Sequence, residues 1–125
     1  MTPKFCRMAW RVDDMDDFTR RMGELFGFSF FAPSLIAELY PDAGFNVMFG
    51  QHGIEPIQPG PEGLAFAEGD PLIEIAIDVN GADSVLARMR AAGHEPIAIS
   101  HLPVPAVDEY LFGRDFHGIQ FLACD

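Results

Sequence analysis

Basic residues are scarce in this chain. Its 8 lysines and arginines stand against 19 aspartates and glutamates, which gives a formal net charge of -11. This balance argues against a nucleic-acid partner or an anionic membrane, because binding to phosphates depends on Lys and Arg. Two explanations of the acidic surface stay open: it serves solubility alone, or it attracts a cationic ligand.

Cysteines are few, and long apolar runs are missing. We expect Cys6 and Cys124 to be reduced, structural thiols, because strand alternation turns Cys6 away from residues 7, 9 and 11 and a disulfide needs favourable geometry. The opening MTPKFCRMAW lacks the apolar core of a signal peptide. No stretch approaches the roughly 20 apolar residues of a membrane helix. These absences predict a cytoplasmic protein without a membrane partner.

Several motifs of known chemistry are also missing. The chain contains no nucleophile motif, no phosphate-binding glycine loop and no cysteine-based metal site, which sets aside the enzyme classes built on them. What it does contain is 49% hydrophobic residues in 125, including 12 phenylalanines. That composition suits a single domain, residues 1–125, whose aromatic side chains can line a cavity as well as fill a core.

The first part of the chain follows a strand–helix–strands plan. The stretch KFCRMAWRV alternates like a half-buried strand, with Arg7 and Arg11 on the same side. An amphipathic helix follows, capped by Asp13 or Asp14 and ended by Gly27. Three strand candidates come next, at residues 28–33, 35–40 and 45–50.

The last part of the chain repeats this plan. A strand at 73–79, a helix at 82–92 ended by Gly93, and strands at 95–100, 109–115 and 119–124 recur in the same order. We therefore expect a first βαβββ unit at residues 4–50 and a second at 71–125. The Gly- and Pro-rich residues 51–70 between them are interpreted as a linker or flap, and the choice between a plain connector and a lid stays open.

Two consecutive βαβββ units resemble the vicinal oxygen chelate superfamily, also called the glyoxalase, bleomycin-resistance and extradiol-dioxygenase fold. The most specific local similarities are the VDD helix start at Val12, the helix end RAAGHE, and GRDFHGIQFLA, in which Phe116 replaces the proline of the family's turn. The resemblance implies an α+β fold of two tandem βαβββ units that form a curved mixed sheet around a cleft. For its bleomycin-resistance branch it also implies a homodimer.

The resemblance further implies where a metal would bind, and this sequence departs from the pattern there. The family's ligand positions fall on Arg7, Glu74, Leu122 and Met48. A divalent cation needs imidazoles, thiolates or carboxylates, whereas Arg stays positively charged and repels it. His94 and His117 are interpreted as loop or surface residues. We therefore predict a metal-independent member with no cofactor.

Equivalent positions of the two units carry opposite charges. Arg7 matches Glu74, and Arg11 matches Asp78. We predict an ion pair between Arg7 and Glu74, with a second pair between Arg11 and Asp78 as a weaker extension. Such a pair either holds the two units in register or also binds a polar group of a ligand, and both interpretations stay open.

Strand alternation predicts the other residues of the cleft. The polar and apolar candidates are Asn46, Met48, Gln120, Leu122, either Glu38 or Tyr40, and either Tyr110 or Phe112. The Met and Phe positions are equally compatible with an ordinary core. His52 and His101 are the side chains best suited to proton transfer near neutral pH.

Two functions fit these features. The first is a small-molecule-binding protein of the bleomycin-resistance type, which holds a largely apolar or aromatic ligand with Arg7, Arg11, Glu74 and the cleft residues above. The alternative is a metal-free isomerase, cyclase or lyase that uses Glu74, Asp78, His52 or His101 as the acid or base. We rank the enzyme second, because an arginine partner lowers the pKa of a carboxyl group and makes it a weak base.

Overall fold

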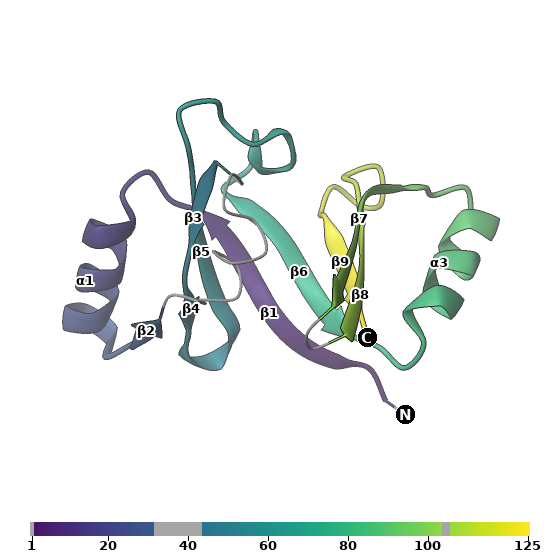
Figure 1. Ribbon diagram of the computed structural model, residues 1–125, viewed down its shortest axis with the longest axis horizontal. Coiled ribbons are helices and arrows are strands. Elements are labelled where there is room, and N and C mark those ends of the chain that lie inside the picture. Colours follow the sequence, from purple (N-terminus) through teal and green to yellow (C-terminus); the bar gives the residue numbers. More distant parts are fainter. Residues whose placement is uncertain (1, 32–43, 104–105) are drawn as a thin grey trace. The chain divides into compact units, whose positions relative to one another are not determined.

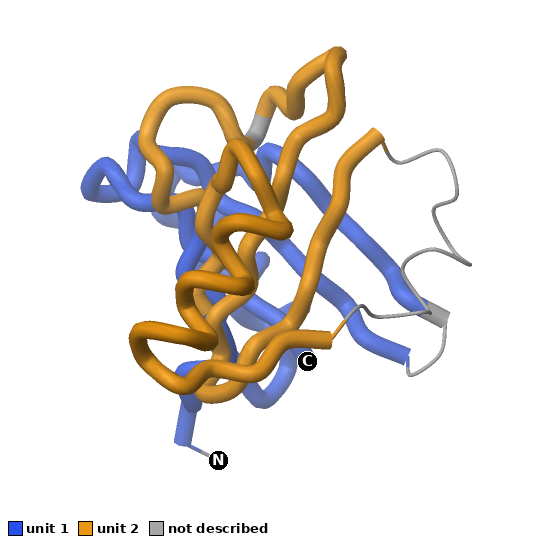
Figure 2. The backbone as a smooth tube through the Cα atoms, turned by 90° about the vertical axis from the view of Figure 1, so that its left-hand side faces the viewer, with its two compact units in different colours: residues 1–7, 74–125 blue, residues 8–73 orange. Residues whose placement is uncertain are grey.

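The computed structural model describes residues 2–31, 44–103 and 106–125. Two compact units divide the chain (Figure 2): unit 1 comprises residues 1–7 and 74–125, and unit 2 comprises residues 8–73. The predicted strand at 35–40, with Glu38 and Tyr40, lies outside the described residues. None of the helices in the described part of the chain is long and apolar enough to span a membrane.

Unit 2 places helix α1 (Met15–Phe26) beside a small mixed sheet (Figure 1). Strand β1 (Lys4–Arg11) pairs in parallel with β5 (Ile54–Pro59), and β5 pairs in antiparallel with β3 (Phe45–Val47). A separate two-stranded sheet joins β2 (Phe30–Phe31) to β4 (Phe49–Gly50). The short helices η1 (Gln51–Gly53) and η2 (Ala65–Ala67) flank β5.

The sequence signals of α1 act as predicted. The Asp14 carboxylate accepts a hydrogen bond from the Asp17 N–H at 3.0 Å, which satisfies a backbone donor of the first turn. Gly27 closes the helix with a φ of 75°, a left-handed conformation that glycine adopts without steric cost.

The prediction for the segment after α1 was only partly right. The expected strand at 45–50 is divided into β3 and β4, with Met48 between them. Residues 51–70, interpreted as a linker or flap, contain β5, whose Glu55, Pro56 and Ile57 are buried. The two prolines of β5 and its glycine-rich flanks hid this strand, because both residue types are typical of loops.

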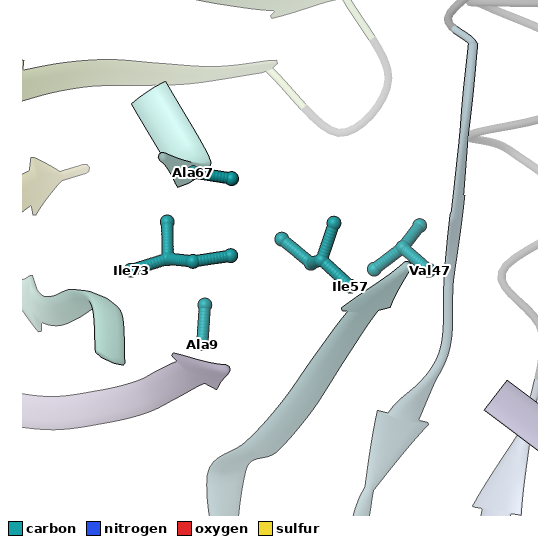
Figure 3. Close-up of a cluster of buried hydrophobic side chains, with 5 residues drawn as sticks. All are labelled: Ala9, Val47, Ile57, Ala67 and Ile73. Carbon is teal, nitrogen blue, oxygen red and sulfur yellow. The ribbon is translucent and has the colours of Figure 1, made fainter. Parts of the chain in front are cut away.

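The core of unit 2 lies on the side of β1 that carries Ala9 (Figure 3). Ala9 is fully buried with Val47, Ile57, Ala67 and Ile73. Ala67 comes from η2, so the end of the 51–70 segment packs on this face of the strand. The side of β1 that carries Ala9 is therefore covered at this residue.

Unit 1 combines helix α3 (Ala82–Ala91) with the strand order β6-β9-β8-β7 (Figure 1). These strands are β6 (Leu72–Asp78), β7 (Pro96–Pro103), β8 (Ala106–Phe112) and β9 (Phe121–Cys124). β9 is parallel to β6 and antiparallel to β8. Helices beside mixed parallel and antiparallel strands confirm the predicted α+β class.

Both cysteines of unit 1 are free. Cys6 is exposed, whereas the buried Cys124 thiol donates a hydrogen bond to the Ile77 carbonyl at 3.4 Å. Burial raises the pKa of the Cys124 thiol to about 12, which keeps it protonated at neutral pH.

Candidate functional site

An arginine held between two carboxylates forms a largely buried polar cluster in unit 1. Arg7 Nη2 lies 3.1 Å from Glu109 Oε1, to which it donates a hydrogen bond, and 3.6 Å from Glu74 Oε1. The side chains of Arg7, Glu74 and Glu109 are 19%, 8% and 17% exposed. The predicted Arg7–Glu74 pair is therefore present, and Glu109 is a partner that the sequence did not reveal.

The register of the sheet explains why Glu109 reaches this cluster. Ala76 pairs with Leu122, and Leu122 pairs with Leu111, so these three residues share one face. Glu74 lies two residues before Ala76 and Glu109 lies two residues before Leu111, which puts both carboxylates on that face as well. The result is a charged cluster on the same sheet face as the buried side chains of Leu111 and Leu122.

Burial changes the proton affinity of Glu74. Its loss of hydration raises the pKa of the carboxyl group from 4.5 to about 7; Arg7 lowers the pKa and Glu109 raises it. The sequence alone supports the assumption that the arginine dominates and lowers the pKa of Glu74. The structure reverses that assumption, because desolvation outweighs the Arg7 charge. Glu74 can therefore exchange a proton near neutral pH.

Tyr110 and Phe112 lie on the other face of β8, so their predicted place in the cleft was wrong. They are buried in a cluster with Val79, Ala82 and Ala123, against which α3 residues pack. The Tyr110 hydroxyl donates a short hydrogen bond to Asp83 Oδ1, which raises the pKa of Tyr110 to about 12. Successive residues of a strand point to opposite faces. A prediction that is wrong by one residue therefore puts Tyr110 and Phe112 on the face that Glu109 and Leu111 occupy.

Gln120 and Leu122 are both buried in unit 1, and the Gln120 carbonyl accepts a hydrogen bond from the Ile75 N–H at 3.0 Å. Asp78 is the exposed last residue of β6. His101 lies on β7, where its Nδ1 is 2.6 Å from Asp108 Oδ1 and its side chain is 65% exposed. The structure does not place His101 in the buried cluster around Glu74, so a role there has no support.

The other predicted residues belong to unit 2. Arg11 Nη1 donates a hydrogen bond to the Ala67 carbonyl at 2.7 Å, which ties β1 to η2. Asn46 is exposed on β3, and the Met48 N–H donates to the Pro56 carbonyl at 3.2 Å. His52 lies in η1 with a left-handed φ of 59° and contacts the Phe28 ring edge-on. The Arg11–Asp78 pair stays a prediction.

The donor set at the implied metal positions does not fit a divalent cation. Of Arg7, Glu74, Met48 and Leu122, only Glu74 is an oxygen ligand suited to such an ion, and it lies beside a permanent positive charge. Across residues 2–31, 44–103 and 106–125, no group of three or more His, Cys, Asp or Glu side chains is arranged to hold a metal ion.

Comparison with known proteins rests on structure alone, because no family model and no curated protein sequence matches this chain. A hypothetical protein from Bacillus halodurans superimposes with a TM-score of 0.78 at 15% identity, over 99% of this chain and 94% of its own. A Streptomyces coelicolor methylmalonyl-CoA epimerase in complex with 2-nitronate-propionyl-CoA gives 0.75 at 14% identity, over 97% and 95%.

A third similar structure carries the name of the predicted superfamily. It is a glyoxalase/bleomycin resistance protein/dioxygenase superfamily member from Vibrio splendidus, with a TM-score of 0.63 at 16% identity over 98% of both chains. At this level of identity the likeness establishes the fold. The chain has the vicinal oxygen chelate fold that its two repeats predicted.

Proposed function

We propose that this chain is a metal-independent small-molecule-binding protein of the glyoxalase/bleomycin-resistance type. The observation that carries the proposal is the Arg7–Glu74–Glu109 cluster beside the apolar Leu111 and Leu122. A fixed cation and two acceptors next to aliphatic side chains are groups that small-molecule sites use, since in such sites a few polar groups orient a mainly apolar ligand.

The arginine supports a metal-independent site in particular. Arg7 occupies a position where the resembled family has a metal ligand, and a guanidinium provides the positive charge without an ion. Its side chain keeps 19% exposure, so a polar group of a ligand can compete with Glu109 for its donors. We propose a largely apolar or aromatic ligand with one such polar group, and the homodimer implied by the resemblance stays part of this proposal.

Ligand capture tests the proposal. Wild type and the variants Arg7→Met and Arg7→Lys are dialysed against a metabolite extract, and retained compounds are identified by mass spectrometry. We expect wild type to retain a compound at near one equivalent, Arg7→Lys to retain it partly, and Arg7→Met to lose at least tenfold in occupancy, because a charged hydrogen bond contributes roughly 1.5–3 kcal/mol.

A matched control separates this effect from a change in total charge. Arg20 also lies between two carboxylates, Asp17 and Glu24, but on the exposed surface of α1. Arg20→Met is expected to retain the compound like wild type. Equal retention by Arg7→Met and wild type, with both variants folded by circular dichroism, contradicts the proposal.

A second function is favoured by the Glu74 pKa of about 7. A carboxyl group that titrates near neutral pH is suited to general acid–base catalysis, which a metal-free isomerase, cyclase or lyase needs. In this alternative Glu74 removes a proton from the ligand, and the nearby Arg7 stabilises the negative charge that develops.

Solvent deuterium distinguishes catalysis from binding. If Glu74 transfers protons, the retained compound incubated with wild type in heavy water gains deuterium at carbon, and Glu74→Gln slows this gain by at least a hundredfold, the lower range of a general base's contribution, about 10²–10⁴. If the compound returns with its mass unchanged, the protein binds its ligand without proton transfer.

A further inference from the structure

A pocket whose lining does not include the Arg7 cluster lies in unit 2 next to α1. Its volume is about 690 Å³, within the range typical of small-molecule sites. It is lined by one stripe of α1, by the end of β1 with the loop that follows, and by Ile54 of β5. Neither the fold comparison nor the proposed function assigns a role to this pocket.

The pocket exists because α1 closes on the sheet at only one end. Met15 is buried at the start of the helix, and its N–H donates to Gln58 Oε1 at 2.7 Å. Further along the same stripe, Phe18 and Met22 are only half-buried, and Leu25 is 67% exposed. The apolar part of the lining comes mainly from Phe18, Met22, Leu25, Trp10 and Ile54.

The charged part of the lining is mainly acidic. Asp13, Asp14 and Asp17 line the pocket near the start of α1. Two backbone donors at this end of the helix are already bonded, because Gln58 accepts from the Met15 N–H and Asp14 accepts from the Asp17 N–H. An anionic ligand would therefore meet carboxylates where an uncapped helix start would offer N–H groups.

Two arginines also line the pocket, and both keep their positive charge. Arg11 donates to the Ala67 carbonyl at 2.7 Å. Arg21 lies seven residues after Asp14, about 10 Å further along the helix axis at 1.5 Å per residue. The pocket thus combines an apolar body with a carboxylate-lined end.

We propose that this pocket binds an amphipathic cation, a molecule with an aliphatic or aromatic body and an ammonium head. The body contacts Phe18, Met22 and Leu25, while the head lies near Asp13, because Asp17 is already paired with Arg20 at 2.8 Å. The indole of Trp10 adds an aromatic surface that attracts cations. The net charge of -11 raises the local concentration of such a ligand.

The only tryptophan of the chain reports directly on this site. Because Trp10 lines the pocket, its fluorescence is expected to change on binding. The probe is octyltrimethylammonium, used below its micelle concentration, and octanoate and octanol supply the same chain with a negative and a neutral head. We expect saturable binding in the order cation, neutral, anion.

Two pairs of matched variants locate the site. Asp13→Asn is expected to weaken the cation about twofold to fivefold, the range for exposed ion pairs, and to leave octanol unchanged. Asp16→Asn removes the same charge from the same turn, but Asp16 does not line the pocket, so no such loss is expected. Leu25→Ala should weaken all three probes, whereas Phe26→Ala, equally exposed but outside the lining, should not.

Three results would overturn the proposal. One is that none of the three probes produces a saturable change of Trp10 fluorescence. Another is octanoate binding as tightly as octyltrimethylammonium, which would remove the cation preference. The third is an equal loss in Asp13→Asn and Asp16→Asn, which would assign the effect to total charge. None of these results bears on ligand retention by Arg7, so the two sites are tested independently.

Discussion

Replacing Arg7 by methionine is expected to lower the free energy of unfolding by about 3–5 kcal/mol above pH 8. Glu74 is 8% exposed and lies 3.6 Å from the guanidinium, so the substitution leaves a buried charge without its cation. Glu109 loses its 3.1 Å hydrogen bond as well. Below pH 6 the loss should be smaller, because Glu74 escapes the penalty by taking up a proton.

Urea unfolding at pH 6 and pH 8.5 measures this effect, and two further variants identify its cause. In the double variant Arg7→Met/Glu74→Gln the buried charge is gone, so much of the lost stability should return at pH 8.5. Arg20→Met breaks two exposed ion pairs at 2.8 and 3.1 Å and should change stability little. If Glu74→Gln restores nothing in the Arg7→Met background, the buried Glu74 charge is not the origin of the loss.

The Arg7–Glu74 pair could be predicted because it depends only on the repeat. Equivalent positions of the two βαβββ units carry complementary charges. Arg7 lies as far before Val12 as Glu74 lies before Val79. Glu109 could not be found this way, because its place depends on the register between β8 and β9. A shift of one residue there turns Tyr110 and Phe112 from the site to the α3 side.

The raised pKa of Glu74 could not be predicted from the sequence either. A list of residues shows that an arginine is near, which predicts a lowered pKa, but it does not show how much water the carboxyl group loses. In the structure that loss dominates and the pKa moves to about 7. This removes the main objection to Glu74 as a base, which was its expected acidity.

The same limit applies to β5 and to the α1 pocket. Periodicity predicted the apolar stripe of α1, yet how far that stripe closes on the sheet depends on packing, and only Met15 is buried. In β5, two of the six residues are prolines, which are rare inside strands. The sequence therefore did not indicate a strand there, although the centre of β5 is buried. Local composition describes the preference of a segment, whereas tertiary contacts decide its final state.

The pH dependence of stability gives the second large effect. Glu74 has a pKa of about 7 in the folded chain against 4.5 for the ordinary group. Between these values the folded state binds more protons than the unfolded state, so the free energy of unfolding decreases as pH rises. This one group should remove about 3 kcal/mol of stability between pH 4.5 and pH 7.5.

Glu74→Gln isolates this contribution, because all other carboxylates titrate in both proteins. Urea unfolding at half-unit pH steps should show wild type losing stability relative to Glu74→Gln as pH rises from 4.5 to 7.5, with no further change above pH 8. Removing Glu109, which raises the Glu74 pKa, should move this window to lower pH, and removing Arg7 should move it higher. A constant difference between wild type and Glu74→Gln would mean that the folded carboxyl group keeps its ordinary pKa, and the proton-transfer function would then lose its basis.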